Sequence, residues 1–203
     1  MDHYFLLKRL NISYGISHSV LDWLTSYLTN RTQFVQLNGS CSKSSVVTCG
    51  VPQGSVLGLI LFLSYTADLT RLVNAHNLQV HLYADDTQVY GFCDIEDSAS
   101  FQNAVSACID DISVWMRSNR LQLNAEKTEV MWCASSRRMH LVPAVPHRVG
   151  ADNVTPVSFV QDLGVYLDAD ASMTTHISRT AASCFGILRY LVMLLCRSSP
   201  VLC

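Results

Sequence analysis

This sequence of 203 residues has little charge and no excess of basic side chains. Charged residues make up 15% of it, hydrophobic residues make up 49%, and the formal net charge is −2. A disordered chain needs low hydrophobicity and a high net charge, so this composition excludes one. Proteins that bind nucleic acid on their own normally show a basic face, and the composition argues against that class as well.

Several targeting and metal signals are also missing. No pair among the eight cysteines has the C-x-x-C spacing of a zinc site, so we expect reduced thiols, several of them buried. No signal peptide opens the chain. The longest apolar run, 56–63, falls short of the ~20 residues that span a membrane, which predicts an intracellular protein without a transmembrane segment.

The most informative stretch present is Tyr83-Ala84-Asp85-Asp86. Apolar and polar residues alternate before the two carboxylates and again in 87–90, which predicts two short strands that meet at a tight turn. Adjacent carboxylates repel each other, and a divalent cation such as Mg²⁺ is their usual partner, together with substrate phosphates. The alternative is a solvated turn, because Asp is common in turns.

A second informative stretch is the loop 50–58, Gly-Val-Pro-Gln-Gly-Ser-Val-Leu-Gly. Gly50 and Gly54 permit unusual backbone angles and close approach of a ligand, and Pro52 stiffens the loop between them. Gln53 offers a neutral donor and acceptor to a nucleotide. Ser55 is placed to cap a helix that runs on to residue 69. The alternative is an ordinary junction between a loop and a helix.

Periodicity predicts the remaining elements and an α+β fold. We expect helices from residue 6 to 10, at 17–30 with a cap at Ser17 or Ser19, at 97–118, and from 177 to 191. Strands are expected at 33–37 and 45–49 around an Asn38-Gly39 turn, at 130–133, and in a hairpin within 157–168, with a long connection over 135–156. Trp23 is expected in the core, and Asp110-Asp111 on a solvated helix face.

These motifs, in this order, closely resemble those of reverse transcriptases, above all the enzymes of jockey-like non-LTR retrotransposons. The resemblance runs from Asp2 to about Leu191. It implies a polymerase palm, in which an antiparallel sheet carries the catalytic hairpin and helices pack on one face. Residues 1–170 would form the palm with partial fingers, and residues 171–203 would open the thumb.

The resemblance also implies an activity, template-directed DNA synthesis on RNA, and roles for single residues. Asp85 and Asp86 would be catalytic and hold two Mg²⁺ (or Mn²⁺) ions. Nucleotide or template contacts would come from Pro52, Gln53, Gly54, Tyr83 and Arg31, leaving-group stabilisation from Lys127, and a primer grip from Leu163 and Gly164. The partners would be an RNA template, a DNA primer and deoxynucleoside triphosphates, in the cytoplasm and nucleus. From the residues alone, Arg31 is an ordinary surface cation, and the alternative for Lys127 is an exposed lysine before a strand.

The start of the sequence lacks one expected carboxylate. Asp2-His3 matches the end of the family's motif Phe-Asp-x-Val-Asp-His, whose metal-binding Asp precedes the part present here. Asp2 therefore matches the second, non-catalytic Asp, and we expect residues 1–203 alone not to polymerise. Two other functions stay open: a catalytically inactive retrotransposon remnant, and a repurposed nucleic-acid-binding module.

Overall fold

The structure, a computed structural model, describes residues 1–143, 145–150 and 152–198, and side chains to residue 194. It combines helices with short antiparallel strands, which confirms the α+β class. The chain forms two compact units: unit 1 is residues 1–93 with 100–124, and unit 2 is residues 94–99 with 125 onward. Whether the expected palm and thumb divide at residue 170 stays a prediction.

Most of the elements belong to unit 1. Its elements are α1 His3–Tyr14, α2 His18–Leu28, β1 Arg31–Gln33, β2 Gln36–Leu37, β3 Ser40–Cys41, β4 Ser45–Val47, α3 Val56–Thr66, α4 Asp68–Ala75, β5 Gln79–Tyr83, β6 Asp86–Tyr90 and α5 Ser98–Ser118, which starts two residues before the unit boundary. Unit 2 contains η1 Ile95–Asp97, η2 Ala125–Lys127, η3 Met139–Leu141, β7 His147–Val149, β8 Asp152–Val154, β9 Phe159–Asp162, β10 Val165–Asp168 and α6 Thr174–Ser198.

The strands pair two by two, always antiparallel. Within the described part of the chain the pairs are β1–β4, β2–β3, β5–β6, β7–β8 and β9–β10, without a larger sheet. The expected strand at 130–133 is wrong. Its neighbourhood makes isolated backbone bonds, from Val157 N to Val130 O (2.8 Å) and from Ala134 N to Ala169 O (3.0 Å), and no continuous ladder. Two lone bonds do not fix a strand register.

The first core of unit 1 joins α1, α2 and α3. It is built from Leu6, Leu10, Leu24, Leu28, Leu61 and Tyr65. Their spacing places one apolar stripe of each helix against the others, as the sequence predicted for the first two. Trp23 was wrongly expected in this core: it is 56% exposed and stacks on Tyr27, with the rings 5.8 Å apart and 12° from parallel.

Tyr65 connects this core to the end of α5. Its hydroxyl donates to the Asn119 carbonyl (2.5 Å) and accepts from the Asp2 amide (3.4 Å). Burial raises the pKa of the Tyr65 phenol, which keeps it a neutral donor. The guanidinium of Arg9 lies 5.3 Å from the Tyr65 ring centre. One buried hydroxyl thus joins three segments of unit 1.

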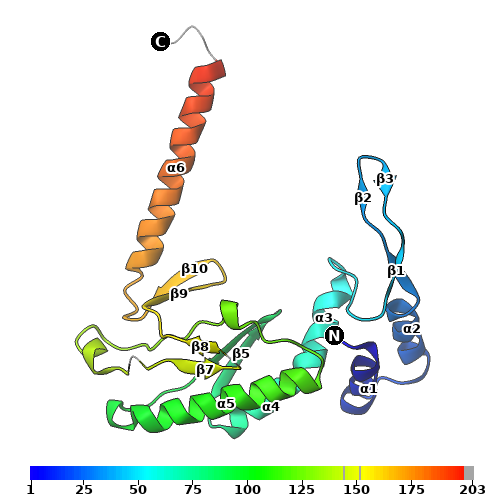
Figure 1. Cartoon of the computed structure of the whole chain (residues 1–203), viewed down its shortest axis with the longest axis horizontal. Helices are drawn as coiled ribbons and strands as arrows, with labels where there is room; N and C mark the ends of the chain where they lie inside the picture. Colours follow the sequence, from blue (N-terminus) through cyan, green and yellow to red (C-terminus); the bar gives the residue numbers. More distant parts are fainter. Residues whose placement is uncertain (144, 151, 199–203) are drawn as a thin grey trace. The chain divides into compact units, whose positions relative to one another are not determined.

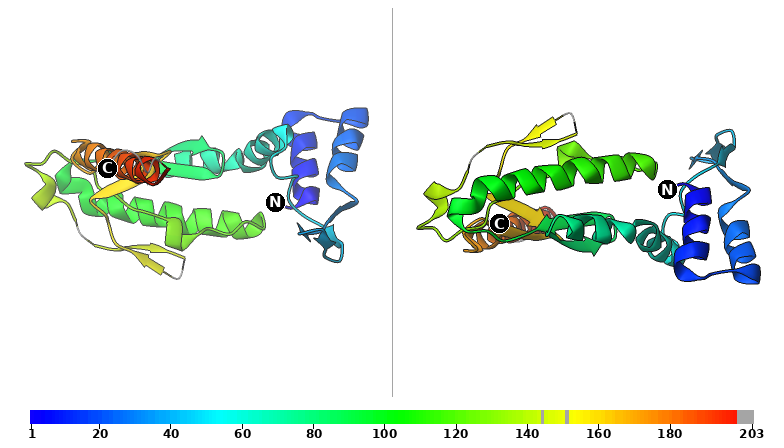
Figure 2. Two further views of the ribbon diagram at one scale, coloured as in Figure 1. Left: turned by 90° about the horizontal axis from the view of Figure 1, so that it is seen from above. Right: turned by 90° about the horizontal axis from the view of Figure 1, so that it is seen from below.

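The second core lies under the β5–β6 hairpin. Its fully buried members, Leu69, Val73, Leu78, Cys108 and Ile112, come from α4, the start of β5 and α5. Val80, Leu82 and Val89 of the hairpin pack on them from one face. Figure 2 shows α5 running beside α4 and the hairpin. Helices therefore cover one face of this hairpin.

A two-stranded arm projects from α1 and α2 (Figure 1). The β1–β4 ladder forms its base, and the β2–β3 ladder closes around Asn38 and Gly39. Both turn residues have positive φ, 48° and 80°, which is the hairpin turn that an Asn-Gly pair favours. The predicted turn is confirmed.

The helix that follows the loop is shorter than predicted. It ends at Thr66, whose hydroxyl donates back to the carbonyls of Phe62 (3.1 Å) and Leu63 (3.4 Å), and α4 starts two residues later. Such back-bonding bends helices.

The stretches Val56–Ala75 and Thr174–Leu194 are apolar and long enough to cross a membrane by composition. Core helices of soluble proteins, which are mostly buried, pass the same test, whereas 28% of the first stretch and 0% of the second are buried.

Unit 2 contains the predicted Leu-Gly hairpin and the last helix. Arg179 of α6 lies over the rings of Phe159 and Tyr166, 4.6 Å from each ring centre. Hydrogen bonds from Thr175 and Ser172 lower the pKa of Asp168, which holds the start of α6. The side chains of α6 are exposed from Ile177 to Leu194.

The cysteines were expected to be reduced and several of them buried. None of the six with described side chains forms a disulfide, and Cys108 is the only buried one among them. Cys196 and Cys203 lie outside the described side chains.

Candidate active site

The tip of the β5–β6 hairpin presents both carboxylates of the Asp-Asp pair. Tyr83 pairs with Asp86 in the last register position, which leaves Ala84 and Asp85 as a two-residue turn. Ala84 has a φ of 52°, in the left-handed region. An L-residue there costs roughly 1–2 kcal/mol relative to a relaxed backbone. The two predicted strands and their tight turn are confirmed.

The two faces of this hairpin differ in chemistry. Val80 and Leu82 point to the core, so His81, Tyr83 and Asp86 share the opposite face by the alternation of a strand and its partner. Tyr83 is 57% exposed, and Asp86 is exposed beside it. One face of the hairpin is therefore acidic and aromatic, and the opposite face packs on the second core.

The carboxylates of Asp85 and Asp86 have no ion pair or side-chain hydrogen bond to other residues that the structure describes. Their oxygens are hard donors, the kind that Mg²⁺ and Mn²⁺ take, and Mg²⁺ commonly uses one or two carboxylates plus phosphates. No group of three or more His, Cys, Asp or Glu ligands occurs in the described ranges of the chain. The pair thus fits a divalent-ion site as two of its ligands.

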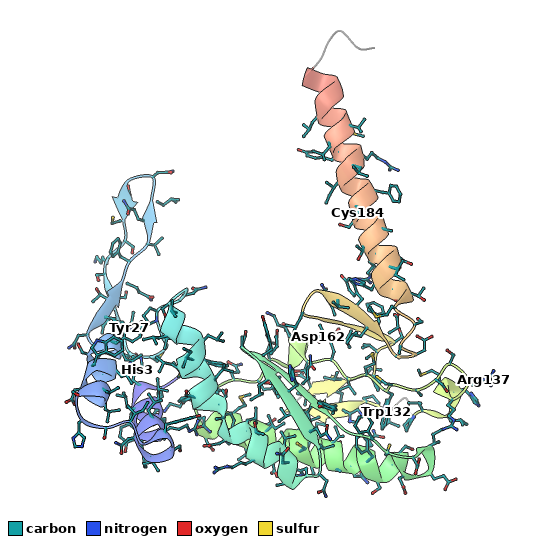
Figure 3. All side chains as sticks on the ribbon, turned by 180° about the vertical axis from the view of Figure 1, so that it is seen from behind. His3, Tyr27, Trp132, Arg137, Asp162 and Cys184 are labelled. Atoms are coloured by element: carbon teal, nitrogen blue, oxygen red, sulfur yellow. The ribbon has the colours of Figure 1, made fainter. Side chains whose placement is uncertain are left out.

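The loop 50–55 is tied at its first residue. The Gly50 carbonyl lies 2.7 Å from Nη2 of Arg31 and 2.7 Å from Nε2 of His3, and its amide donates to the Met1 carbonyl (2.8 Å). Gly50 has a φ of 77°, which glycine adopts without strain. Figure 3 labels His3 near the base of the arm.

The same loop is tied again where α3 begins. Ser55 occupies the N-cap, and its hydroxyl accepts from the Gly58 amide (3.1 Å), which confirms the predicted cap. A Cβ on Gly58 would lie 3.1 Å from the hydroxyl oxygen of Ser55, closer than an ordinary contact, so a side chain at this position would crowd the cap. Gln53 and Gly54 stay exposed at the apex.

Arg31 bonds two backbone carbonyls of its own unit, and its expected contact with nucleotide or template stays a prediction. Its Nε donates to the carbonyl of Leu28 (2.9 Å), the last residue of α2, while Nη2 donates to Gly50. The side chain is therefore committed to the backbone of its own unit. The sequence analysis missed His3, because its contact partner Gly50 is 47 residues away and no local sequence pattern predicts this contact.

Asp2 is engaged in structural contacts. Its carboxylate accepts from the Phe5 amide (3.2 Å), which caps α1, and pairs with Arg120 at 2.7 Å. This agrees with its match to a non-catalytic position. The predicted solvated Asp111 is exposed and pairs with His76 at 2.9 Å.

The other predicted site residues belong to unit 2. Lys127 is exposed at the end of η2. Leu163 and Gly164 form the two-residue turn between β9 and β10, with φ values of 45° and 86°. Asp162, labelled in Figure 3, pairs with Val165 to close that turn. Unit 1 therefore supplies the hairpin and the loop, and these three residues stay separate predictions.

Comparisons with known proteins point in one direction. The family model described as reverse transcriptase (RNA-dependent DNA polymerase) matches residues 2–167. A probable RNA-directed DNA polymerase from transposon BS of Drosophila melanogaster is 28% identical over 183 residues, 88% of this chain. The RNA-directed DNA polymerase from mobile element jockey of the same organism is 28% identical over 164 residues, 75% of this chain.

This chain is much shorter than those relatives. The matched part covers 20% of the transposon BS protein and 17% of the jockey protein. The chain therefore spans about a fifth of the curated relatives that it matches. No solved structure is significantly similar to it.

Proposed function

Because this chain belongs to the reverse transcriptase family, we propose that it contributes a palm region to RNA-templated DNA synthesis. The reaction class is nucleotidyl transfer, in which a primer 3′-hydroxyl attacks the α-phosphate of a deoxynucleoside triphosphate and pyrophosphate leaves. The cell interior, where template and nucleotides occur, is the proposed location.

The observation that carries this proposal is the hairpin tip. Two adjacent carboxylates stand on a rigid, packed ladder, and they have no protein partner within the described residues. Two exposed negative charges side by side are unfavourable unless a cation compensates them. A site built on packed strands also holds its ligands more accurately than a free loop does.

We assign Asp85 and Asp86 as ligands of the two expected Mg²⁺ or Mn²⁺ ions. When bound, such ions stabilise charge on the attacking and leaving oxygens of an in-line phosphoryl displacement. The chain's own residues position the reactants. Tyr83 offers an exposed ring for the primer strand, and Gln53 at the loop apex offers its amide to the nucleotide or template.

The remaining roles complete the proposal. Pro52 and Gly54 shape the loop around Gln53, and the φ of 75° at Gly54 favours glycine. Lys127 would donate charge or a proton to the pyrophosphate, and the Leu163-Gly164 turn would hold the primer end. Each of these roles depends on the family assignment and on the exposure of the side chains or turns.

The test is a titration of Mn²⁺ with a deoxynucleoside triphosphate, followed by water proton relaxation. The double variant Asp85→Asn/Asp86→Asn should lose the saturable enhancement of the parent chain. Asp110→Asn/Asp111→Asn is the matched control, because it neutralises the other adjacent Asp pair, whose side chains diverge on a helix. Equal enhancement by the parent and the Asp85/Asp86 variant would overturn the assignment.

A further inference from the structure

We propose that Arg31 and His3 are positioning residues, which hold the Gly50 carbonyl and thereby fix the loop 50–55 for nucleotide recognition. This inference rests on the proposed function for the role of the loop, and on the hydrogen-bond distances at Gly50 for the clamp itself. The clamp is defined as Arg31, His3 and the peptide of Gly50.

The chemistry of the clamp is determined by its acceptor. A carbonyl oxygen only accepts, so the tautomer of His3 with a proton on Nε2 donates to the Gly50 carbonyl at 2.7 Å; the same nitrogen lies 3.5 Å from Nη2 of Arg31. Arg31 donates to the same oxygen at 2.7 Å. Both nitrogens thus converge on the one Gly50 carbonyl oxygen, and the two contacts together restrain the Gly50–Val51 peptide.

Arg31 links the loop to two other elements. Its Nε satisfies the carbonyl of Leu28, one of the last carbonyls of α2, which lack helical partners. Its own backbone pairs with Val47 at the base of the arm. The planar guanidinium donates in fixed directions, so one side chain sets the distance from the end of α2 to Gly50.

The clamp acts on the loop from the end opposite to the Ser55 cap. Between them only five peptide units connect Gly50 to Ser55, and Val51 packs on the first core. A short segment held at both ends has few conformations left. Gln53 at its apex is then pre-organised, and pre-organised contacts lose less entropy when a ligand binds.

A direct contact between Arg31 and a template phosphate is the rival role, and salt dependence separates the two. A side chain that neutralises a phosphate contributes a slope of about −0.7 to the dependence of log K on log salt for a single strand. A positioning residue changes nucleotide affinity and leaves that slope unchanged. The side chain is half-buried and has two backbone acceptors already, which favours positioning.

The test uses the whole chain with Arg31→Ala and Arg31→Lys, and with Lys43→Ala as a control that removes an exposed charge from the arm. Amide hydrogen exchange is followed at Gly50 and Ser55, whose amides bond Met1 and Pro52. Arg31→Ala should accelerate exchange there about tenfold or more, as expected for loss of a charged donor, while amides of α5 stay protected. Arg31→Lys, which cannot reach both acceptors at once, should give an intermediate rate.

Affinity measurements supply the second arm. Arg31→Ala should weaken Mn²⁺-nucleotide binding about tenfold and leave the salt slope of RNA binding at the parent value. Unchanged exchange at Gly50 and Ser55 in Arg31→Ala would overturn the clamp. A slope reduced by about 0.7 would show that Arg31 contacts phosphate instead. If the parent chain binds no nucleotide, the proposed function fails, and the exchange data still decide the clamp.

Discussion

Gly91 follows β6 at the open end of the β5–β6 hairpin, and replacing it with alanine tests how tightly the hairpin packs against the second core. A Cβ at this position would lie 2.8 Å from Cε2 and 2.9 Å from Cζ of Phe101, and 2.9 Å from Cδ2 of Leu78. Ordinary contact begins at 3.4 Å. The Phe101 ring and the Leu78 methyl group would therefore both have to retreat by about half an ångström.

This retreat is costly because both neighbours belong to the second core. Leu78 is 3% exposed and Phe101 packs on the buried cluster, so a shift of either side chain disturbs the packing of this core. Overpacking a core by one methyl group typically costs about 1–3 kcal/mol. For a chain of this length, a loss of 1 kcal/mol lowers the melting temperature by roughly 2–4 °C.

Urea unfolding of the parent, Gly91→Ala and Asn103→Ala measures this effect. Asn103 lies on the exposed face of α5 and should stay within about 0.5 kcal/mol of the parent. Adding Phe101→Leu to Gly91→Ala should recover part of the loss, because it removes the ring that the new methyl group meets. Equal stability of Gly91→Ala and the parent would refute the tight packing of the hairpin against the second core.

Three other substitutions test separate parts of the fold. Tyr65→Phe removes the donor to the Asn119 carbonyl and should cost about 1–3 kcal/mol in urea unfolding, whereas no loss would show that the bond contributes nothing. Ala84→Gly should raise the free energy of unfolding by up to about 1 kcal/mol, because it relieves the positive φ, and a decrease would argue against that turn. His147 is 2% exposed, and burial lowers its pKa from 6.5, so the folded chain prefers the neutral imidazole. The stability that this preference contributes is present above pH 6.5 and declines as pH falls below it. His147→Phe should flatten this pH dependence in unfolding measurements between about pH 8 and pH 5, and an unchanged slope would assign it to another group.

Local patterns predicted the elements that depend on local physics. The alternation around Asp85 and Asp86 predicted the hairpin, because successive side chains of a strand point to opposite faces. The Asn38-Gly39 pair predicted the turn of the arm, because these two residue types favour the positive φ that the turn needs. The stripe of α5 was equally readable. Of these elements, the β5–β6 hairpin carries the proposed metal ligands.

Features that depend on distant contacts were not readable from the sequence. Periodicity placed Trp23 on a helix and could not tell that its face lacks a covering element in the described chain. The apolar run 130–133 has strand-like composition, but no neighbouring strand pairs with it among the described residues. The clamp on Gly50 joins residues 19 and 47 positions away, so only the folded chain brings them together.

The most direct test of the account is primer extension on an RNA template with Mg²⁺ or Mn²⁺. It compares residues 1–203 with the same residues preceded by a strand that carries the family's first catalytic Asp. We predict extension by the longer chain alone, its loss in Asp85→Asn/Asp86→Asn, and its retention in Asp110→Asn/Asp111→Asn. Misaligned ligands can cost on the order of a hundredfold in rate, and for this reason we expect no primer extension by the shorter chain. Extension by the longer chain that survives replacement of Asp85 and Asp86 would contradict the account.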